Sequence, residues 1–244
     1  WKTIKILGQR EWMAILWIST FGGILGTFFY TKALGYINYI NLSVVVLLQK
    51  LQPVFAIALS SIILKEKLSK RFISLAIVAI LGGYLVTFGS ASTLVWNDKA
   101  IIASLLAILS AFCWGSSTVL GKHALKILPY EAVTSLRLSL TALFALLVLF
   151  ATSEATTVLY LTTIQWQRVI MIVFSSGAVA LAIYYYGLEK LPASHTTIYE
   201  LAWPLSAVAL DWIIRGQLLS TSQIFGALML LVSMVILSRE SYDN

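Results

Sequence analysis

Charged residues are scarce in this sequence, and their scarcity excludes a soluble domain. Only 11% of the 244 residues are charged and 59% are hydrophobic, whereas about 25% of the residues are charged in a typical soluble protein. A soluble chain of this length needs far more charge to cover its surface, and the mean hydropathy of +0.90 agrees. The sequence therefore indicates a protein whose solvent is the membrane.

Cysteine and histidine are also rare, which excludes several kinds of site. The single cysteine, Cys113, excludes a disulfide framework and a cysteine-based zinc or iron–sulfur site. With only two histidines, His123 and His195, we expect no metal site and no cofactor. The net charge is +7, but the basic residues fall in loops between apolar runs, so we expect no nucleic-acid partner.

Eight apolar runs predict membrane-spanning helices, because about 20 helical residues cross a ~30 Å hydrocarbon core. Five of them are uncharged: 12–31, 72–97, 101–121, 169–188 and 216–238. Three others carry polar residues within the run: 42–64 with Lys50, 130–152 with Arg137, and 194–214 with Glu200 and Asp211. Continuous apolarity lacks the alternation of a membrane barrel. We therefore expect an all-α membrane protein.

The placement of lysine and arginine predicts how the chain is oriented. If the N-terminus is cytoplasmic, eleven basic residues lie on the cytoplasmic side and only Lys99, Arg168 and Arg215 on the outer side. Cytoplasmic loops of membrane proteins carry an excess of basic residues. We expect a multi-pass protein of the plasma (inner) membrane with both termini in the cytoplasm.

The chain contains an internal repeat with two related offsets. An offset of 154 residues aligns Gly23 with Gly177, and an offset of 151 residues aligns Pro53 with Pro204. Each offset is supported by four matches, which makes a chance alignment of two apolar helices the minor interpretation. The first three runs therefore correspond to the last three.

The two runs in the middle of the chain, 101–121 and 130–152, have no upstream counterpart. We expect a complete five-helix repeat at 100–238, and only the last three helices of a first repeat at 1–92. The full arrangement would have ten helices, of which this chain lacks the first two. An odd number of helices per repeat gives inverted copies, as in many secondary transporters.

Several segments resemble the EamA-type repeat of the drug/metabolite transporter superfamily. They are 30–34 (YTKAL), 51–55 (LQPVF), 65–69 (KEKLS), 82–85 (GGYL) and 111–117 (AFCWGSS). The resemblance covers nearly the whole chain and implies an inverted-repeat (5+5) transporter fold, but it is uninformative about the substrate. One departure is local: the second repeat reads GQL at 216–218 where the first reads KEK at 65–67.

Ionisable residues inside a membrane are costly, so they are candidates for function. Lys50 lies three residues before Pro53, and Glu200 lies at the position equivalent to Gln49. We expect Gln49, Lys50, Gln52 and Glu200 to form a polar cluster, with Lys50 and Glu200 as charge partners or substrate contacts. The alternative is an interhelical ion pair that never touches substrate.

The same segments carry two prolines and several aromatic residues. Pro53 and Pro204 each remove a backbone hydrogen bond, which predicts a kink with either a gating role or a purely structural one. Aromatic side chains that lie inside the runs, beyond the interfacial belt, predict a π-rich cavity wall. The candidates for this wall are Tyr30, Trp114, Tyr184, Tyr199 and Trp203.

Two further predictions concern Arg137 and the most apolar helices. Arg137 lies about 10 Å into its helix, so its long side chain can reach the cytoplasmic face, and we expect a structural role. The helices at 72–92 and 218–238 carry no charge near their centres. We expect them at the periphery, against lipid or against the second protomer of a homodimer.

The repeat, the resemblance and the polar cluster together predict a secondary transporter and not an enzyme. We expect an exporter or exchanger of small organic metabolites such as amino acids, with alternating access and with lipid as its surroundings. No Walker-type loop is present, so we do not expect ATP to be the direct energy source. Glu200 is the only carboxylate deep within an apolar run, so it is the candidate for proton coupling, and uncoupled exchange is the alternative. An intramembrane lipid-modifying enzyme and a structural membrane subunit remain open as alternatives. The absence of HExxH and GxSxG argues against the enzyme.

Overall fold

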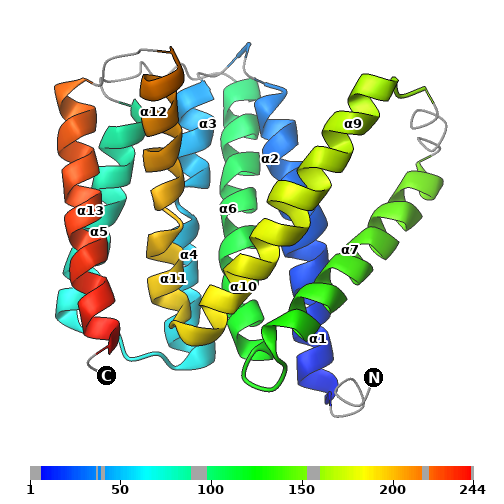
Figure 1. The fold of residues 1–244 in the computed structure, drawn as a ribbon, viewed down its shortest axis with the longest axis horizontal. Coiled ribbons are helices and arrows are strands. Elements are labelled where there is room, and N and C mark those ends of the chain that lie inside the picture. The colour runs from blue at the N-terminus through cyan, green and yellow to red at the C-terminus, as the bar shows by residue number, and fades with distance from the viewer. Residues whose placement is uncertain are drawn as a thin grey trace. The chain divides into compact units, whose positions relative to one another are not determined.

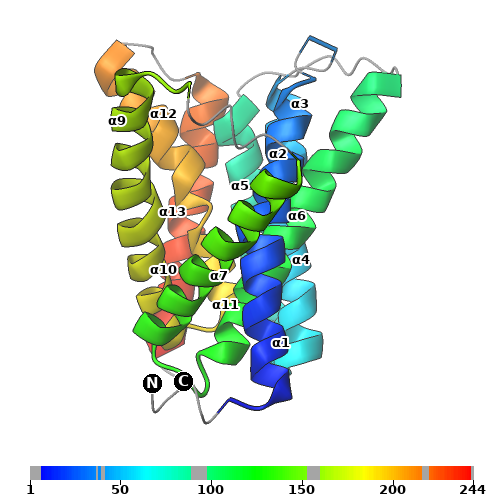
Figure 2. The same cartoon turned by 90° about the vertical axis from the view of Figure 1, so that its right-hand side faces the viewer.

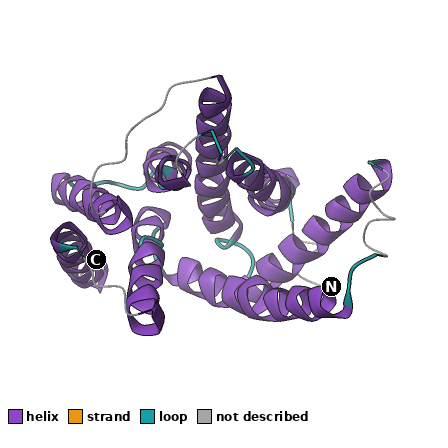
Figure 3. Ribbon diagram, turned by 90° about the horizontal axis from the view of Figure 1, so that it is seen from above, coloured by secondary structure: helices purple, strands orange, loops and turns teal. Residues whose placement is uncertain are grey.

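The computed structural model describes residues 7–36, 38–39, 42–88, 98–152, 160–215 and 220–242. Every regular element in these residues is a helix (Figure 3). The chain divides into two compact units, each described by itself. The first unit comprises Trp1–Leu25 and Leu120–Lys190, and the second comprises Gly26–Val119 and Leu191–Asn244.

The first unit is built mainly from long helices. They are α1 (Gln9–Trp17), which continues into the π-helical segment η2 (Ile18–Leu25), then α7 (Tyr130–Ala151), and finally α9 (Thr163–Ile172), η4 (Val173–Val179) and α10 (Ala180–Lys190). Figure 2 shows α9 running into α10 as one helix. The helix α7 packs against η2 and α10. Close approach needs a glycine at Gly23, because a Cβ there would lie 2.4 Å from the Thr141 hydroxyl oxygen.

The described residues of the second unit form two interrupted helices, three longer helices and the short helix α2. The elements are α2 (Gly26–Leu34), α3 (Leu42–Gln49), α4 (Gln52–Leu59), η3 (Ser60–Leu64), α5 (Lys70–Phe88), α6 (Asp98–Ala124, to Val119 in this unit), α11 (Ala193–Tyr199), α12 (Ala202–Arg215) and α13 (Thr221–Tyr242). Figure 1 shows α13 beside α5 and α12 following α11 with a break between them. The α5–α13 contact depends on glycine, because a Cβ on Gly82 would lie 2.7 Å from the Gly226 carbonyl oxygen.

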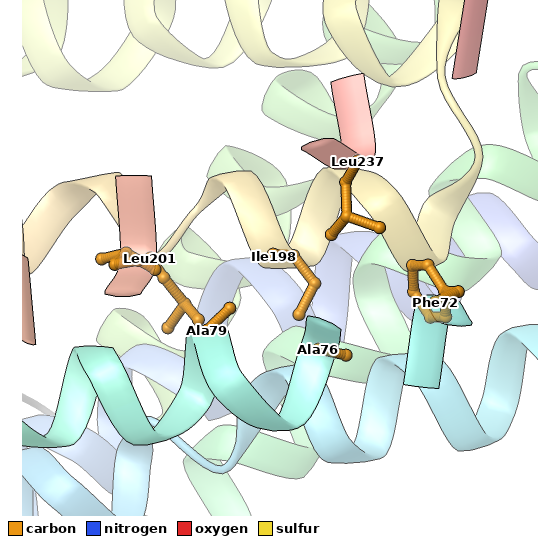
Figure 4. Packing of buried hydrophobic residues seen from close by; sticks show 7 residues of the cluster. Phe72, Ala76, Ala79, Ile198, Leu201 and Leu237 are labelled. Atoms are coloured by element: carbon orange, nitrogen blue, oxygen red, sulfur yellow. The ribbon is translucent and has the colours of Figure 1, made fainter. Parts of the chain in front are cut away.

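An apolar cluster fixes α11 against α5 within the second unit. Ile198 and Leu201 lie against Ala76 and Ala79 of α5, as Figure 4 shows. These side chains are at most 4% exposed. Successive helical residues are about 100° apart, so Glu200 faces away from α5 while Ile198 faces towards it.

Six helices of the described chain are long and apolar enough to cross a membrane. They are Gln9–Leu34, Val44–Leu64, Asp98–Ala124, Tyr130–Ala151, Thr163–Lys190 and Thr221–Arg239. The prediction of an all-helical membrane protein is confirmed, while the count of eight spans and the 5+5 arrangement stay predictions. The ends of two expected spans, 89–97 and 216–219, lie outside the described residues.

The helix α6 extends beyond its apolar run at both ends, and charge explains why. The expected span 101–121 is part of α6, which begins at Asp98 and ends with Lys122 and His123 in its last turn. An acid at the N-terminus and basic groups at the C-terminus complement the helix dipole, so the helix continues past the apolar stretch.

The four prolines take two different positions. Pro129 and Pro192 occupy the N-caps of α7 and α11, so they begin helices. Pro53 lies in the first turn of α4, and Pro204 lies in the first turn of α12. Proline is tolerated in a first turn because the N–H it lacks has no helical partner there.

The π-helical segments were not expected from the sequence. With the offset of 154 residues, η2 at 18–25 aligns with 172–179, which contains η4 at 173–179. The local geometry of these two segments is therefore the same at equivalent positions. The inverted orientation of the two repeats remains a prediction.

The outward faces of α5 and α13 are apolar. Ile77, Leu81, Phe225, Leu228 and Val232 are between 51% and 59% exposed. Such faces suit lipid tails, in keeping with the peripheral position expected for 72–92 and 218–238. A homodimer through these helices stays a prediction, and 89–92 and 218–219 lie outside the described residues.

Candidate substrate site

Two helix breaks position the candidate site within the second unit. The first separates α3 from α4 at Lys50 and Leu51, and the second separates α11 from α12 at Glu200 and Leu201. Each break precedes a proline, which has no N–H to donate to the carbonyl four residues earlier. The chain bridges the second break with a shorter bond, from the Trp203 N–H to the Glu200 carbonyl (3.1 Å). The helices are thus interrupted before both prolines, while the expected kinks and a role in gating stay predictions.

A chain of hydrogen bonds joins the two breaks. The Gln49 amide donates from Nε2 to Oε1 of Gln52 (3.1 Å). The Gln52 amide donates in turn from Nε2 to Oε2 of Glu200. The Thr118 hydroxyl on α6 lies 3.4 Å from the other Glu200 oxygen, Oε1. We call Gln49, Gln52, Thr118 and Glu200 the polar cluster from here on; it differs from the expected cluster in that Thr118 is included and Lys50 is not.

The polar cluster supplies partners to a carboxylate that the sequence analysis places within the expected span 194–214. An ionised group there costs from about 2.5 to more than 10 kcal/mol unless it has partners or water. Gln52 and Thr118 provide neutral donors to Glu200, and both come from other helices. The cluster is therefore a fixed polar connection between α4, α6 and the end of α11.

Lys50 takes part through a different kind of contact. Its ammonium group lies over the ring of Trp203, with Nζ 4.3 Å from the ring centroid. The Glu200 carboxylate also attracts this ammonium electrostatically. A cation over an indole ring is a favourable arrangement, and the Trp203 side chain is 59% exposed.

The aromatic candidates fall into two groups. Tyr30 on α2 and Trp114 on α6 form a tilted ring pair with centroids 5.6 Å apart, and both rings are half-buried. Tyr199 is half-buried at the end of α11, next to Glu200. Tyr184 belongs to the first unit, where its ring contacts Tyr185 at 5.5 Å, so it is not described together with the polar cluster.

A small apolar pocket borders the two breaks. Its volume is about 130 Å³, and Leu47, Lys50, Leu51, Leu201 and residues 80–84 of α5 other than Gly82 line it. Sites for drug-sized ligands usually occupy about 300–1,000 Å³. This pocket is therefore too small to hold such a solute by itself, and it adds apolar surface beside the Lys50 side chain.

Two residues of the site were missed by the sequence analysis. Thr118 was not singled out, although its hydroxyl contacts Glu200. Gly115 lies against the first break, because a Cβ there would be 2.8 Å from the Gln52 carbonyl oxygen. The polar and small residues at 115–118 are a signal that could have indicated this role.

Arg137 has a partner in the first unit. Its Nη1 donates to the Tyr185 hydroxyl (2.8 Å), and its guanidinium carbon lies 5.5 Å from the centroid of that ring. The Tyr185 side chain is fully buried. Arg137 therefore links α7 to α10, which suits the structural role expected for it.

Among the residues that the structure describes, no group of three or more His, Cys, Asp or Glu side chains could hold a metal ion. The arrangement offers hydrogen-bonding amides, one carboxylate, one ammonium and aromatic faces. The EamA-like transporter family matches residues 1–88 and 101–239. The chain belongs to this family.

Similar proteins agree with membership of the EamA-like family. The riboflavin transporter ImpX of Fusobacterium nucleatum is 37% identical over 239 residues, which is 98% of this chain and 80% of that protein. Protein LicB of Haemophilus influenzae is 24% identical over 85% of this chain and 70% of its own length. A solved crystal structure shares the fold with a TM-score of 0.72 at 17% identity, covering 93% of this chain and 77% of that one. This EamA-like protein is thus a membrane transporter and not an enzyme.

Proposed function

We propose that this transporter carries riboflavin or a closely related flavin by alternating access. The observation that carries the proposal is the 37% identity with the riboflavin transporter over 98% of this chain. At that coverage, both broken helices fall within the matched part of the two proteins. The chemistry of the candidate site supports the same substrate.

A flavin has three chemical parts that match groups of the site. Its tricyclic ring is flat and aromatic, and it would stack on Trp203 or on the pair of Tyr30 and Trp114. The imide edge of the ring alternates donors and acceptors, as side-chain amides such as Gln52 do. The hydroxyl groups of the ribityl chain would donate to the Glu200 carboxylate.

An amino acid, expected from the sequence, is the second candidate. Lys50 and Glu200 carry opposite charges and act on one another electrostatically, which would suit the carboxylate and ammonium of a zwitterion. A flavin uses the aromatic surface of the site, whereas a small zwitterion uses chiefly its charges. Removing the Trp203 ring should therefore weaken the transport of a flavin more than the transport of a small zwitterion.

The energy source and the orientation are also part of the proposal. Glu200 has the only carboxylate in the polar cluster, so it is our candidate for proton coupling, with uncoupled exchange as the alternative. We place both termini in the cytoplasm and the protein in the plasma (inner) membrane, because the basic residues predict that topology. We retain the homodimer through the helices at 72–92 and 218–238 as part of the proposal.

Counterflow in proteoliposomes tests the substrate. Vesicles loaded with unlabelled riboflavin should accumulate labelled riboflavin. Vesicles loaded with an unlabelled amino acid should not accumulate the same amino acid in labelled form, for any member of a panel. Trp203→Ala and Gln52→Ala should each raise the KM for riboflavin at least tenfold. Gln9→Ala changes an exposed amide at the start of α1 and should leave the KM unchanged. Accumulation driven by an amino acid and not by riboflavin would overturn the flavin assignment in favour of the second candidate.

A further inference from the structure

The carboxylate of Glu66 lies at the start of α11, more than a hundred residues away in the sequence. Its Oε1 accepts a hydrogen bond from the backbone N–H of Ala193 (2.8 Å), and its Oε2 accepts one from the N–H of Ser194 (3.1 Å). Glu66 belongs to the loop between η3 and α5. This two-pronged contact therefore joins that loop to the second broken helix, at the opposite end from Glu200.

The helix α11 needs an acceptor at this position. Ala193 and Ser194 are its first two residues, and the first amides of a helix have no partner within it. The N-cap residue is Pro192, whose side chain has no hydrogen-bond acceptor. Glu66 takes the place of the capping side chain, and its negative charge is favoured at the N-terminus of a helix.

The backbone of the loop directs Glu66 towards α11. Lys65 adopts a left-handed conformation with φ 57°, the only positive φ at a non-glycine residue in the described part of the chain. On the other side of Glu66, the Ser69 hydroxyl accepts a hydrogen bond from the Phe72 N–H and caps α5 (2.9 Å). Glu66 is half-buried, whereas Lys65 and Lys67 on either side of it are exposed. The carboxylate is thus held in place by local structure.

The segment α4–η3 is tied to α11 at both ends. At one end Gln52 donates to Glu200, and at the other Glu66 accepts from Ala193 and Ser194. Between these two ties, α11 packs along α4. We propose that Glu66 is a latch that holds α11 on α4–η3 in one conformation of the transport cycle and releases it in the other.

The latch rests on the proposed alternating access, which requires helices beside the site to separate and return. Two features suit a contact that opens and closes. The carboxylate is half-buried, so water can replace the two amides as its partners when α11 moves. The contact also ends at a helix of only seven residues, Ala193–Tyr199, which is flanked by Pro192 and by the break at Glu200.

Thiol accessibility measures the position of α11 without any substrate. Thr197 lies on α11 and is fully buried, so Thr197→Cys in a Cys113→Ser background provides one protected thiol. Glu66→Ala should increase the rate at which a membrane-impermeant maleimide modifies that thiol about tenfold or more. Glu66→Gln, which keeps one acceptor oxygen, should lie between Glu66→Ala and the parent.

Glu131→Ala is the matched control, because Glu131 is an exposed acid in the first turn of α7 that makes no part of the latch. It should leave the modification rate unchanged. Equal rates in the parent, Glu66→Ala and Glu66→Gln would overturn the latch. If Glu66→Ala fails to insert into the membrane, a Glu66→Gln modification rate equal to that of the parent would overturn the latch, and a higher rate would support it.

Cross-linking separates a latch from a purely structural cap. Glu66→Cys/Ala193→Cys in the Cys113→Ser background would be joined by a short bifunctional thiosulfonate in proteoliposomes. Uptake should stop on cross-linking and return with a reductant, because the latch can no longer open. Full uptake in the cross-linked protein would mean that this contact never opens, and the proposal would be wrong. Absence of riboflavin uptake in the Cys113→Ser parent, which keeps Glu66, would instead count against the substrate, while the accessibility test would still report on the latch.

Discussion

Replacing Gly115 on α6 with alanine should displace Gln52 on α4 and so disturb the Gln52–Glu200 hydrogen bond, although Gly115 itself takes no part in that bond. A Cβ at this position would lie 2.8 Å from the Gln52 carbonyl oxygen and 3.2 Å from the backbone nitrogen of Ala56. Real Cβ atoms essentially never approach other atoms within 3.0 Å, and both of these are backbone atoms that no rotamer change can move. The first turn of α4 must therefore shift by about 0.6 Å to reach ordinary contact.

The expected free energy combines two opposing effects. Overpacking of this kind costs about 1–3 kcal/mol, whereas alanine is favoured over glycine in a helix interior by roughly 0.5–1 kcal/mol. We expect Gly115→Ala to lower the free energy of unfolding by about 1–2 kcal/mol. For a chain of this size that corresponds to a Tm lower by roughly 2–8 °C. Because the shift also carries Gln52 away from Glu200, the KM for substrate should rise.

Gly83 provides the matched control in the same unit. A Cβ on Gly83 would meet only the Leu201 side chain at 3.7 Å, which is an ordinary contact. Gly83→Ala should therefore keep or raise the Tm and leave the KM unchanged. A thiol-reactive fluorophore reports unfolding directly, because Cys113 is the single cysteine and is buried. A Tm for Gly115→Ala at or above that of Gly83→Ala would refute the steric argument.

Three further predictions concern the charged residues Lys50, Arg137 and Glu200, which lie within the expected spans. Glu200→Gln should abolish the pH dependence of uptake, measured between pH 5.5 and 8, because the amide carries no titrating proton; a retained pH profile would exclude Glu200 as the coupling group. Lys50→Met should raise the KM for an anionic or zwitterionic solute; if Lys50→Met/Glu200→Gln restores uptake lost in the singles, the pair is structural and touches no substrate. Arg137→Met should lower the free energy of unfolding by about 1.5–3 kcal/mol, and in a Tyr185→Phe background the loss should be smaller; equal losses in both backgrounds would mean that the hydrogen bond between them contributes nothing.

The helix breaks and most of the polar cluster could be predicted from the sequence. A proline inside an apolar run removes a backbone hydrogen bond wherever the run lies, so Pro53 and Pro204 predict a disturbed helix without any knowledge of packing. The repeat relates positions on two distant helices, and it grouped Gln49, Lys50, Gln52 and Glu200, whereas the hydrogen bond between Gln52 and Glu200 was not predicted. The family resemblance predicted the transporter class, which the comparisons confirm.

The contacts that the sequence analysis missed depend on how helices pack. Thr118 and Glu200 lie 82 residues apart, and no periodicity or repeat relates α6 to α11. Glu66 follows the same rule: its lysine neighbours indicated only membrane topology, because the amides that it caps belong to another helix. Charge and hydropathy describe each helix alone, whereas these roles arise only when two helices meet.

Under the predicted repeat, the π-helical segments η2 and η4 indicate that one insertion preceded the duplication of the chain. A π-turn accommodates one residue more than an α-turn, so it is what a single-residue insertion leaves inside a helix that keeps its ends in place. Under the predicted repeat, η2 and η4 occupy equivalent positions, so their insertion is older than the duplication that produced the two copies. The segment η3 at 60–64 aligns with 211–215, which is regular α-helix, and the offset of 151 residues is the same on both sides of it, so η3 is a difference in local geometry and not an inserted residue. The copy that contains η3 is also the one whose next residues bring Glu66 to the start of α11.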